Sequence, residues 1–335
     1  MANNNTDQMR RLFNQVILAG PIAEIEDFTE AKTKDGVDYV SFRGIIRCGD
    51  TPVYDTRFRI FSTASRKDPS TGKIVDRPNF VKLRDWCRNC VPLTKSTEDA
   101  TWAELGGFVA MNDYVNNKGM LVQGVQFNIN WTNPFTDYKG EINIEGMLQS
   151  IQDEVRKSNK EDEDGEPTGR KALRIISSDI YGNAVDLRIL KATAEIGQLL
   201  EDNDYGSGSL ATYFITLTPT ENQEAEVKKG GIGKQRTTTQ ARAYLEYMVE
   251  GADPIIEEED EKNYIPPSVF KNLMSERKSK LKEIEENGYQ GGNNGGSSAG
   301  ASSGTKAKAG IGKTNSSAKN KPNVLDEVDD DNMPF

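Results

Sequence analysis

The sequence has no histidine and only three cysteines among 335 residues. Without histidine the chain lacks the commonest general base and every Ser-His or Cys-His arrangement for nucleophilic catalysis. Cys48, Cys87 and Cys90 cannot form a disulfide framework. They offer three zinc ligands, whereas a closed structural zinc site needs four. We therefore expect ordinary cysteines and no catalytic residue, metal site or cofactor, with zinc binding as the alternative.

Long apolar runs are also missing. No apolar stretch approaches the roughly 18 residues that a membrane-spanning helix needs. The first residues, MANNNTDQMRR, lack the apolar segment of a signal peptide. These absences lead us to expect a cytoplasmic protein, and the length predicts about two domains.

The net charge of −10 is unevenly distributed. Residues 1–140 hold 18 Lys and Arg against 17 Asp and Glu, whereas residues 141–290 hold 19 against 30. Local patches in the first part can therefore bind phosphates although the whole chain is acidic.

An internal repeat organises the chain. VILAGPIAEI at residues 16–25 and INIEGMLQSI at 142–151 share an alternating apolar pattern with a central glycine, 126 positions apart. Alternation indicates a strand, and the glycine permits the bend of a small barrel. FRIF at 58–61 and LRIL at 187–190 match next, each followed by a helical pattern and a returning strand pattern. We therefore predict a mainly β chain with two tandem copies of one small barrel, each with an interposed helix.

The C-terminal part has a different composition. An amphipathic pattern predicts a helix over 268–287, packed on the second domain or forming a dimer contact. Residues 288–323 hold nine glycines, five lysines and no acid, which predicts a disordered linker. The expected barrel domains cover residues 1–140 and 141–256. An acidic segment with the helix follows at 257–287, then the linker at 288–323 and an acidic tip at 324–335.

The first repeat carries the candidate nucleic-acid site. Strand alternation assigns Val40, Phe42, Ile46, Phe58 and Ile60 to the core. The opposite face then presents arginines beside aromatic rings: Tyr39, Arg43, Arg47, Arg57, Arg59 and Phe61. A following basic loop adds Arg66, Lys67 and Lys73. Arginines follow a phosphate backbone and aromatic faces stack on unpaired bases, although a merely solvated sheet face is the alternative.

The second repeat has a weaker version of this face. The aligned positions there are Asp186, Arg188 and Leu190, so one arginine is replaced by an acid. The segment KKGGIGKQR at 228–236 is basic and flexible, and it either closes over a DNA strand or is a solvated loop. The candidate DNA contacts of the second repeat are Arg188, Lys228, Lys229, Lys234 and Arg236.

Four features of the sequence belong together: VILAG, VSFRGII, the series Lys118-Gly119, Gly124 and Trp131, and the last residues DDDNMPF. Together they resemble the bacterial single-stranded DNA-binding protein family in a two-barrel form. VILAG and VSFRGII resemble its first two strands, and Lys118-Gly119, Gly124 and Trp131 resemble its final strand. The last residues, DDDNMPF, resemble its acidic tip, with Asn-Met where isoleucine is usual.

The resemblance implies OB-fold barrels that wrap single-stranded DNA without sequence preference. It also implies that the C-terminal tip recruits replication, recombination and repair proteins. Phe61 and Trp131 match family stacking aromatics, and Tyr54 lies near a third. The implied partner-binding residues are Asp329, Asp330, Asp331, Met333, Pro334 and Phe335. We expect a monomer or homodimer in a bacterial cytoplasm, encoded by a bacterium or by a phage. The alternatives are a nucleic-acid-processing enzyme, such as a nuclease or annealing factor, and an RNA-binding OB-fold adaptor.

Overall fold

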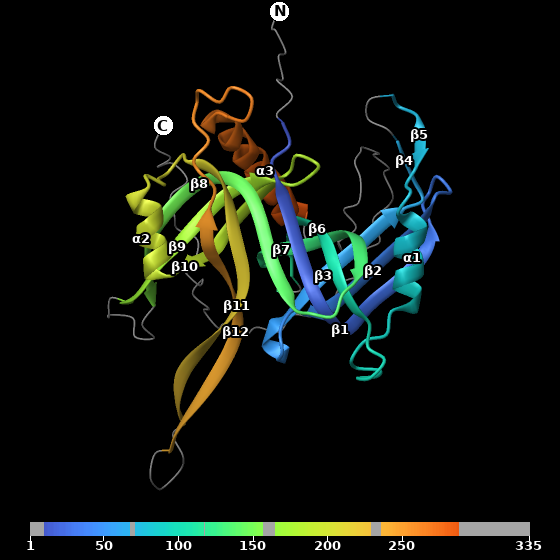
Figure 1. Cartoon of the computed structure of the whole chain (residues 1–335), viewed down its shortest axis with the longest axis horizontal. Helices are drawn as coiled ribbons and strands as arrows, with labels where there is room; N and C mark the ends of the chain where they lie inside the picture. The colour runs from blue at the N-terminus through green and yellow to red at the C-terminus, as the bar shows by residue number, and fades with distance from the viewer. Residues whose placement is uncertain (1–9, 68–70, 117, 157–164, 229–235, 288–335) are drawn as a thin grey trace, which may run out of the picture. The chain divides into compact units, whose positions relative to one another are not determined.

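The computed structural model describes residues 10–67, 71–116, 118–156, 165–228 and 236–287. The chain divides into two units, and the first covers residues 1–292. All described residues belong to the first unit, which is mainly β (Figure 1). Within them, no helix is long and apolar enough to span a membrane.

The first half forms a closed five-stranded barrel. Its strands are β1 (Asn14–Lys32), β2 (Asp38–Arg47), β3 (Asp55–Thr63), β6 (Trp102–Val115) and β7 (Leu121–Pro134). They follow one another in the order β1-β2-β3-β7-β6, and β6 pairs back with β1. Among the described pairings of these five strands, only β3–β7 is parallel. Between β3 and β6 lie the hairpin β4 (Ser65–Lys67) and β5 (Ile74–Asp76) and helix α1 (Phe80–Asn89).

The second half repeats this topology. Its elements are β8 (Lys139–Arg156), β9 (Glu166–Ser178), β10 (Ala184–Ala192), α2 (Ala194–Asp202), β11 (Leu210–Lys228) and β12 (Arg236–Ala252). The order β8-β9-β10-β12-β11 closes through a β11–β8 pair, and β10–β12 is the parallel pair. Five strands closed in this way, with a helix after the third, form an OB-fold-like barrel. The predicted pair of barrels with interposed helices is confirmed.

The two barrels are joined through their first strands. β1 and β8 pair antiparallel from Asn14↔Ile144 to Ala19↔Lys139. Val16 and Ile142, which the sequence repeat aligns, lie directly opposite each other in this pairing and are fully buried. Equivalent residues meet in this way where two copies are related by an approximate two-fold axis. The two copies of the repeated strand therefore also join the barrels, and one apolar core extends across this junction.

Helix α3 (Pro267–Asn287) confirms the predicted C-terminal helix. Its Phe270 is fully buried in a small cluster with residues of the second barrel. Its Arg277 is 5% exposed and donates to both carboxylate oxygens of Asp113 in β6, at 2.5 and 2.9 Å. The helix thus packs against both barrels, whereas the expected packing involved only the second.

Some boundaries differ from the sequence pattern. Residues 108–115, for which the pattern favours neither helix nor strand, lie within β6. The β11–β12 hairpin is longer than the pattern indicates, and it extends away from the barrels (Figure 1). Residues 229–235, which the basic-loop prediction includes, and the linker and tip at 288–335 lie outside the described residues.

Candidate nucleic-acid interface

The outer face of β2 and β3 presents the predicted side chains in a regular ladder. Every residue assigned to the core by alternation is at most 3% exposed: Val40, Phe42, Ile46, Phe58 and Ile60. The outward pairs are Tyr39↔Thr63, Ser41↔Phe61, Arg43↔Arg59, Ile45↔Arg57 and Arg47↔Asp55. Antiparallel pairing therefore holds the arginines and aromatic rings side by side, because directly opposite side chains lie close together.

Tyr39, Arg59 and Phe61 form one cluster, here called the β3 triad. The rings of Tyr39 and Phe61 lie 5.7 Å apart, and the Arg59 guanidinium lies 5.6 Å from the Phe61 ring centre. The Nε atom of Arg59 is buried and has no hydrogen-bond partner among the described residues. Burial lowers the pKa of Arg59, and the nearby Arg43 lowers it further. A cation held in this way, beside an exposed ring, is suited to a phosphate next to a stacked base.

The other three arginines of this face are paired with acids. Arg43 binds Asp27 at 3.1 Å, Arg57 binds Glu26 at 2.7 Å, and Arg47 binds Asp55 through two hydrogen bonds. The sequence prediction missed Glu26 and Asp27 because a β-bulge in β1 changes which residues face outward. Exposed ion pairs contribute about 0–1 kcal/mol, so a phosphate can replace the carboxylate at Arg57, which is 79% exposed.

The remaining first-barrel candidates lie apart from the β3 triad. Tyr54 ends a short 3₁₀ turn (Pro52–Tyr54) and packs its ring on Gly49. Trp131 covers Gly106 so closely that a Cβ atom there would lie 1.9 Å from the indole ring. The structure places the basic candidates Arg66, Lys67 and Lys73 on or beside the β4–β5 hairpin, all exposed.

The second barrel requires a correction to the sequence alignment. In the parallel β3–β7 ladder of the first barrel, Phe58 pairs with Phe127 and Ile60 with Ile129. In the parallel β10–β12 ladder of the second barrel, Leu190 pairs with Tyr247 and Ala192 with Val249. Lys191, between Leu190 and Ala192, is therefore the structural counterpart of Arg59, and Arg188 is not. A bulge between Leu187 and Leu190 shifts the register and turns Leu190 into the core.

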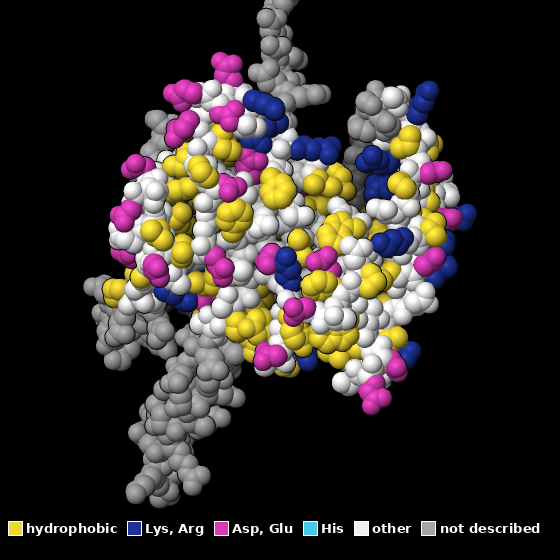
Figure 2. Space-filling model, in the orientation of Figure 1, with side chains coloured by type: hydrophobic (Ala, Val, Ile, Leu, Met, Phe, Trp, Pro, Cys, Tyr) yellow, Lys and Arg dark blue, Asp and Glu magenta, His cyan; other side chains and the backbone are white. Residues whose placement is uncertain are grey.

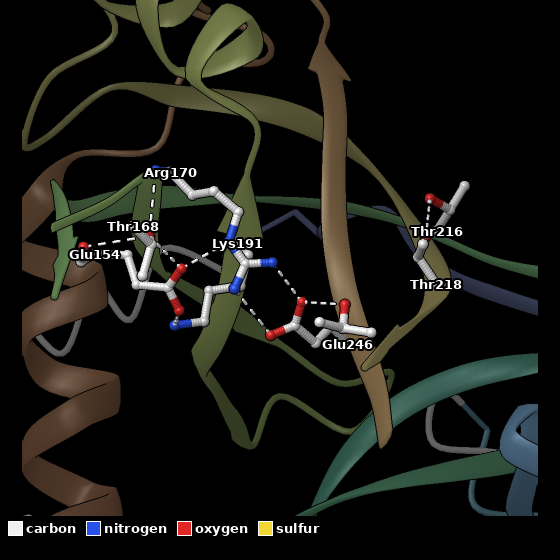
Figure 3. A network of polar contacts seen from close by, with 8 residues as sticks. Glu154, Thr168, Arg170, Lys191, Thr216, Thr218 and Glu246 are labelled. Carbon is white, nitrogen blue, oxygen red and sulfur yellow. Dashed lines mark hydrogen bonds and ion pairs between the residues drawn. The ribbon is translucent and has the colours of Figure 1, made fainter. Parts of the chain in front are cut away.

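The cations of this second face are bound by acids (Figure 3). Lys191 binds Glu154 at 2.5 Å, and Arg170 bridges Glu154 at 2.7 Å and Glu246 at 2.6 Å. Arg188 binds the buried Asp186, which Arg174 also binds. The four-residue group Glu154, Arg170, Lys191 and Glu246 is here called the β9 network.

The hydrogen bonds of the β9 network dominate its electrostatics. Burial raises the pKa of Glu154, but hydrogen bonds from Lys191, Arg170 and Thr168 outweigh burial and lower the pKa to about 2. Glu246 also has a lowered pKa because the hydrogen bonds from Arg170 and Thr220 outweigh its burial. Both carboxylates therefore stay ionised at neutral pH and neutralise the two cations.

Charge is accordingly distributed unequally over the visible face of the molecule. Figure 2 shows more Lys and Arg side chains over the first barrel and many Asp and Glu side chains along the edge of the second. At the β11–β12 hairpin, Lys228 pairs in register with Arg236 at the ends of the two strands. Lys229 and Lys234 lie outside the described residues, as do all six candidate residues of the tip.

Comparison with known proteins places the sequence in a family. The family whose model matches is YorF, and the match covers residues 13–287. The chain belongs to the YorF family. The matched residues include both barrels and helix α3 of this YorF-family protein. No curated protein sequence matches.

Solved structures similar to the YorF-family chain include the single-stranded DNA-binding protein of Thermus aquaticus. A deletion mutant of that protein is 12% identical, with a TM-score of 0.43, and the match covers 77% of this chain and 99% of the mutant. The wild-type protein is 11% identical, with a TM-score of 0.37, covering 74% and 95%.

The cysteines of the YorF-family chain are free thiols. Burial raises the pKa of Cys48 and Cys87 to about 12 and that of Cys90 to about 11. Zinc binds the thiolate, so this burial disfavours the ligand form. Within the described part of the chain, no group of three or more Cys, Asp or Glu residues is placed to hold a metal ion.

Proposed function

We propose that this YorF-family protein binds single-stranded DNA without sequence preference and thereby coats and protects it. The first barrel grips the strand through the β3 triad, with Arg43 and Arg57 beside it. Arg47, Tyr54, Trp131 and the basic β4–β5 hairpin extend the contact, and so does the β11–β12 hairpin with Lys228, Lys229, Lys234 and Arg236. The role is binding without catalysis, in replication, recombination and repair.

One observation carries the proposal: Arg59, partly buried and without a hydrogen-bond partner at Nε among the described residues, lies against the exposed ring of Phe61, which packs on Tyr39 on an OB-fold-like barrel. Stacking contributes about 1–3 kcal/mol per base and accepts any base, because every base has a π-face. The guanidinium supplies the positive charge that a phosphate requires. The aromatic ring and the guanidinium together therefore fit an unpaired base and its phosphate better than they fit a duplex, whose bases are already stacked.

The direct test measures the affinity of the full chain for fluorescent oligo-dT, oligo-U and duplex DNA by anisotropy. We expect oligo-dT to bind most tightly, and log K to fall with log salt by about 0.7 per phosphate contacted. Equal binding of duplex, or no binding of oligo-dT at low salt, would refute the proposal. Equal affinity for oligo-U would indicate an RNA-binding adaptor, and magnesium-dependent cleavage would indicate a nuclease.

We further propose that the acidic tip binds replication, recombination and repair proteins. DDDNMPF combines three carboxylates with an apolar Met-Pro-Phe end, which fits an apolar pocket edged by Arg or Lys. In this proposal the barrels bind DNA and the tip at 324–335 binds proteins. The helix segment at 257–287 and the linker at 288–323 connect these two parts. Deletion of residues 326–335 should preserve or tighten oligo-dT binding and abolish recruitment of such proteins in pull-downs. Unchanged recruitment would refute this role.

A further inference from the structure

A second aromatic–arginine cluster lies at the other end of β2. The rings of Trp102 and Tyr138 are 5.2 Å apart, and Tyr138 is 41% exposed. Tyr138 precedes β8, in the segment that connects the two barrels. Its ring lies against Gly20, where an added Cβ atom would be 3.3 Å from Tyr138 and 1.9 Å from the carbonyl oxygen of Arg47.

Arg47 belongs to the same cluster. Its guanidinium donates two hydrogen bonds to Asp55, of 2.7 and 3.2 Å, which fix its position. Its pKa is raised, first by the bond to Asp55 and in smaller part by its interaction with Tyr138. Trp102, Tyr138 and Arg47 are here called the junction triad, because they lie where the first barrel meets the connection to the second.

The junction triad has the same composition as the β3 triad: two aromatic rings and one arginine. Tyr39 and Arg47 point to the same outer face of β2, because both have the outward alternation of that strand. Eight residues of strand separate them, or about 27 Å. Arg43 lies on the same face between them and pairs with Arg59 across the ladder.

We infer that the junction triad is a second base-stacking site for the same DNA strand, so that single-stranded DNA runs along β2 from the β3 triad to the barrel junction. This inference rests on the proposed function. About 27 Å corresponds to about eight phosphates at the 3.4 Å spacing of one B-form strand, and to fewer in an extended strand. A strand of that length lies within the range of about 4–16 nucleotides bound per OB fold.

Two lengths of oligo-dT test the inference. An oligonucleotide of about 12 nucleotides can occupy both triads, whereas one of about 4 occupies only one at a time. We expect Tyr138→Ala to weaken binding of the longer oligonucleotide by about 5- to 30-fold, and binding of the shorter one by less than about two-fold. Tyr138→Phe should restore the wild-type affinity, because stacking does not need the hydroxyl group.

Tyr181→Ala is the matched control. Tyr181 is 69% exposed and packs on one ring, Phe108, at 5.8 Å, so it is an exposed tyrosine that contacts one other ring, as Tyr138 is. It should leave both affinities unchanged. As a second readout, Trp102→Phe should reduce the quenching of tryptophan fluorescence by long oligo-dT. Trp86→Phe, which alters a ring packed on Phe42, should reduce it less.

The outcomes separate the inference from the proposed function. If Phe61→Ala weakens binding while Tyr138→Ala and Trp102→Phe have no effect, the second stacking site is refuted and the proposed function stands. Equal losses in Tyr138→Ala and Tyr181→Ala also refute the site, because the effect is then not local. If the wild-type chain binds no oligo-dT at either length, the proposed function itself fails.

Discussion

The two barrels share strand order and a helix after the third strand, yet their outer faces hold cations in different ways. In the first barrel Arg59 lies against Phe61, and its Nε atom has no partner among the described residues. In the second, the lysine at the same place in the ladder binds Glu154 at 2.5 Å. A duplicated fold therefore does not carry a duplicated site, because function depends on a few side chains placed on the fold.

Two positions account for much of this difference. Glu154 lies at a β-bulge between Asp153 and Val155 in the pairing of β8 with β9. The parallel ladders make Gln126 the counterpart of Glu246. The second barrel thus has one of its two carboxylates at a bulged position of β8, and the other where the first barrel has an amide. These two carboxylates convert a face with cations available for phosphates into an internally neutralised one.

The largest effect is expected from removing the β3 triad. Arg59→Ala combined with Phe61→Ala should weaken oligo-dT binding by about 30- to 100-fold, since one stacked base and one phosphate contact are lost. The slope of log K against log salt should also fall by about 0.7. Anisotropy titrations at several salt concentrations measure both quantities.

The matched change in the second barrel is Lys191→Ala. Because Lys191 is already bound to Glu154, its loss should change oligo-dT affinity by less than about two-fold. An equal loss of affinity in Lys191→Ala would show that both faces contact DNA. Circular dichroism of each variant establishes that the barrels remain folded.

A second prediction compares the stabilities of the ion pairs in the two barrels. Asp186 has a side chain 1% exposed and binds both Arg174 and Arg188, so Asp186→Ala breaks two ion pairs at a buried position and should lower the free energy of unfolding by about 3–5 kcal/mol. Asp55→Ala in the first barrel breaks a pair about one quarter exposed and should cost about 1 kcal/mol. Urea unfolding followed by circular dichroism measures both, and equal costs would contradict the comparison.

The sequence predicted the elements of this fold better than the contacts of its site. Alternation identified the buried and outward residues of β2 and β3, because both strands are regular there. It did not identify the acids beside Arg43 and Arg57, because the β1 bulge between Ile25 and Asp27 breaks alternation. Neither that bulge nor the one before Leu190 leaves a clear sequence signal.

Long-range contacts were also beyond the sequence pattern. The helix at Pro267–Asn287 was predicted from its amphipathic spacing, but nothing in that spacing pairs Arg277 with Asp113, 164 positions away. The junction triad was missed for the same reason. Trp102 and Tyr138 come together only because β1, β6 and the connection to β8 converge at one end of the first barrel.

The sharpest test of the comparison is a gain of binding, which should be smaller than the loss expected from removing the β3 triad. Glu154→Gln combined with Glu246→Gln removes the carboxylates that hold Lys191 and Arg170 and leaves residues of similar shape. The released cations should raise oligo-dT affinity by about three- to ten-fold and steepen the salt slope by about 0.7 per added phosphate contact.

The control for this gain removes the same number of charges elsewhere. Glu257→Gln with Glu259→Gln alters two exposed residues between β12 and α3, outside the β9 network. If the loss of net negative charge alone strengthens DNA binding, both double variants will gain equally, and that result would contradict our interpretation. A gain confined to the Glu154 and Glu246 variant would instead mean that the second barrel has kept a phosphate-binding face, and that two carboxylates, not the fold, keep DNA from it.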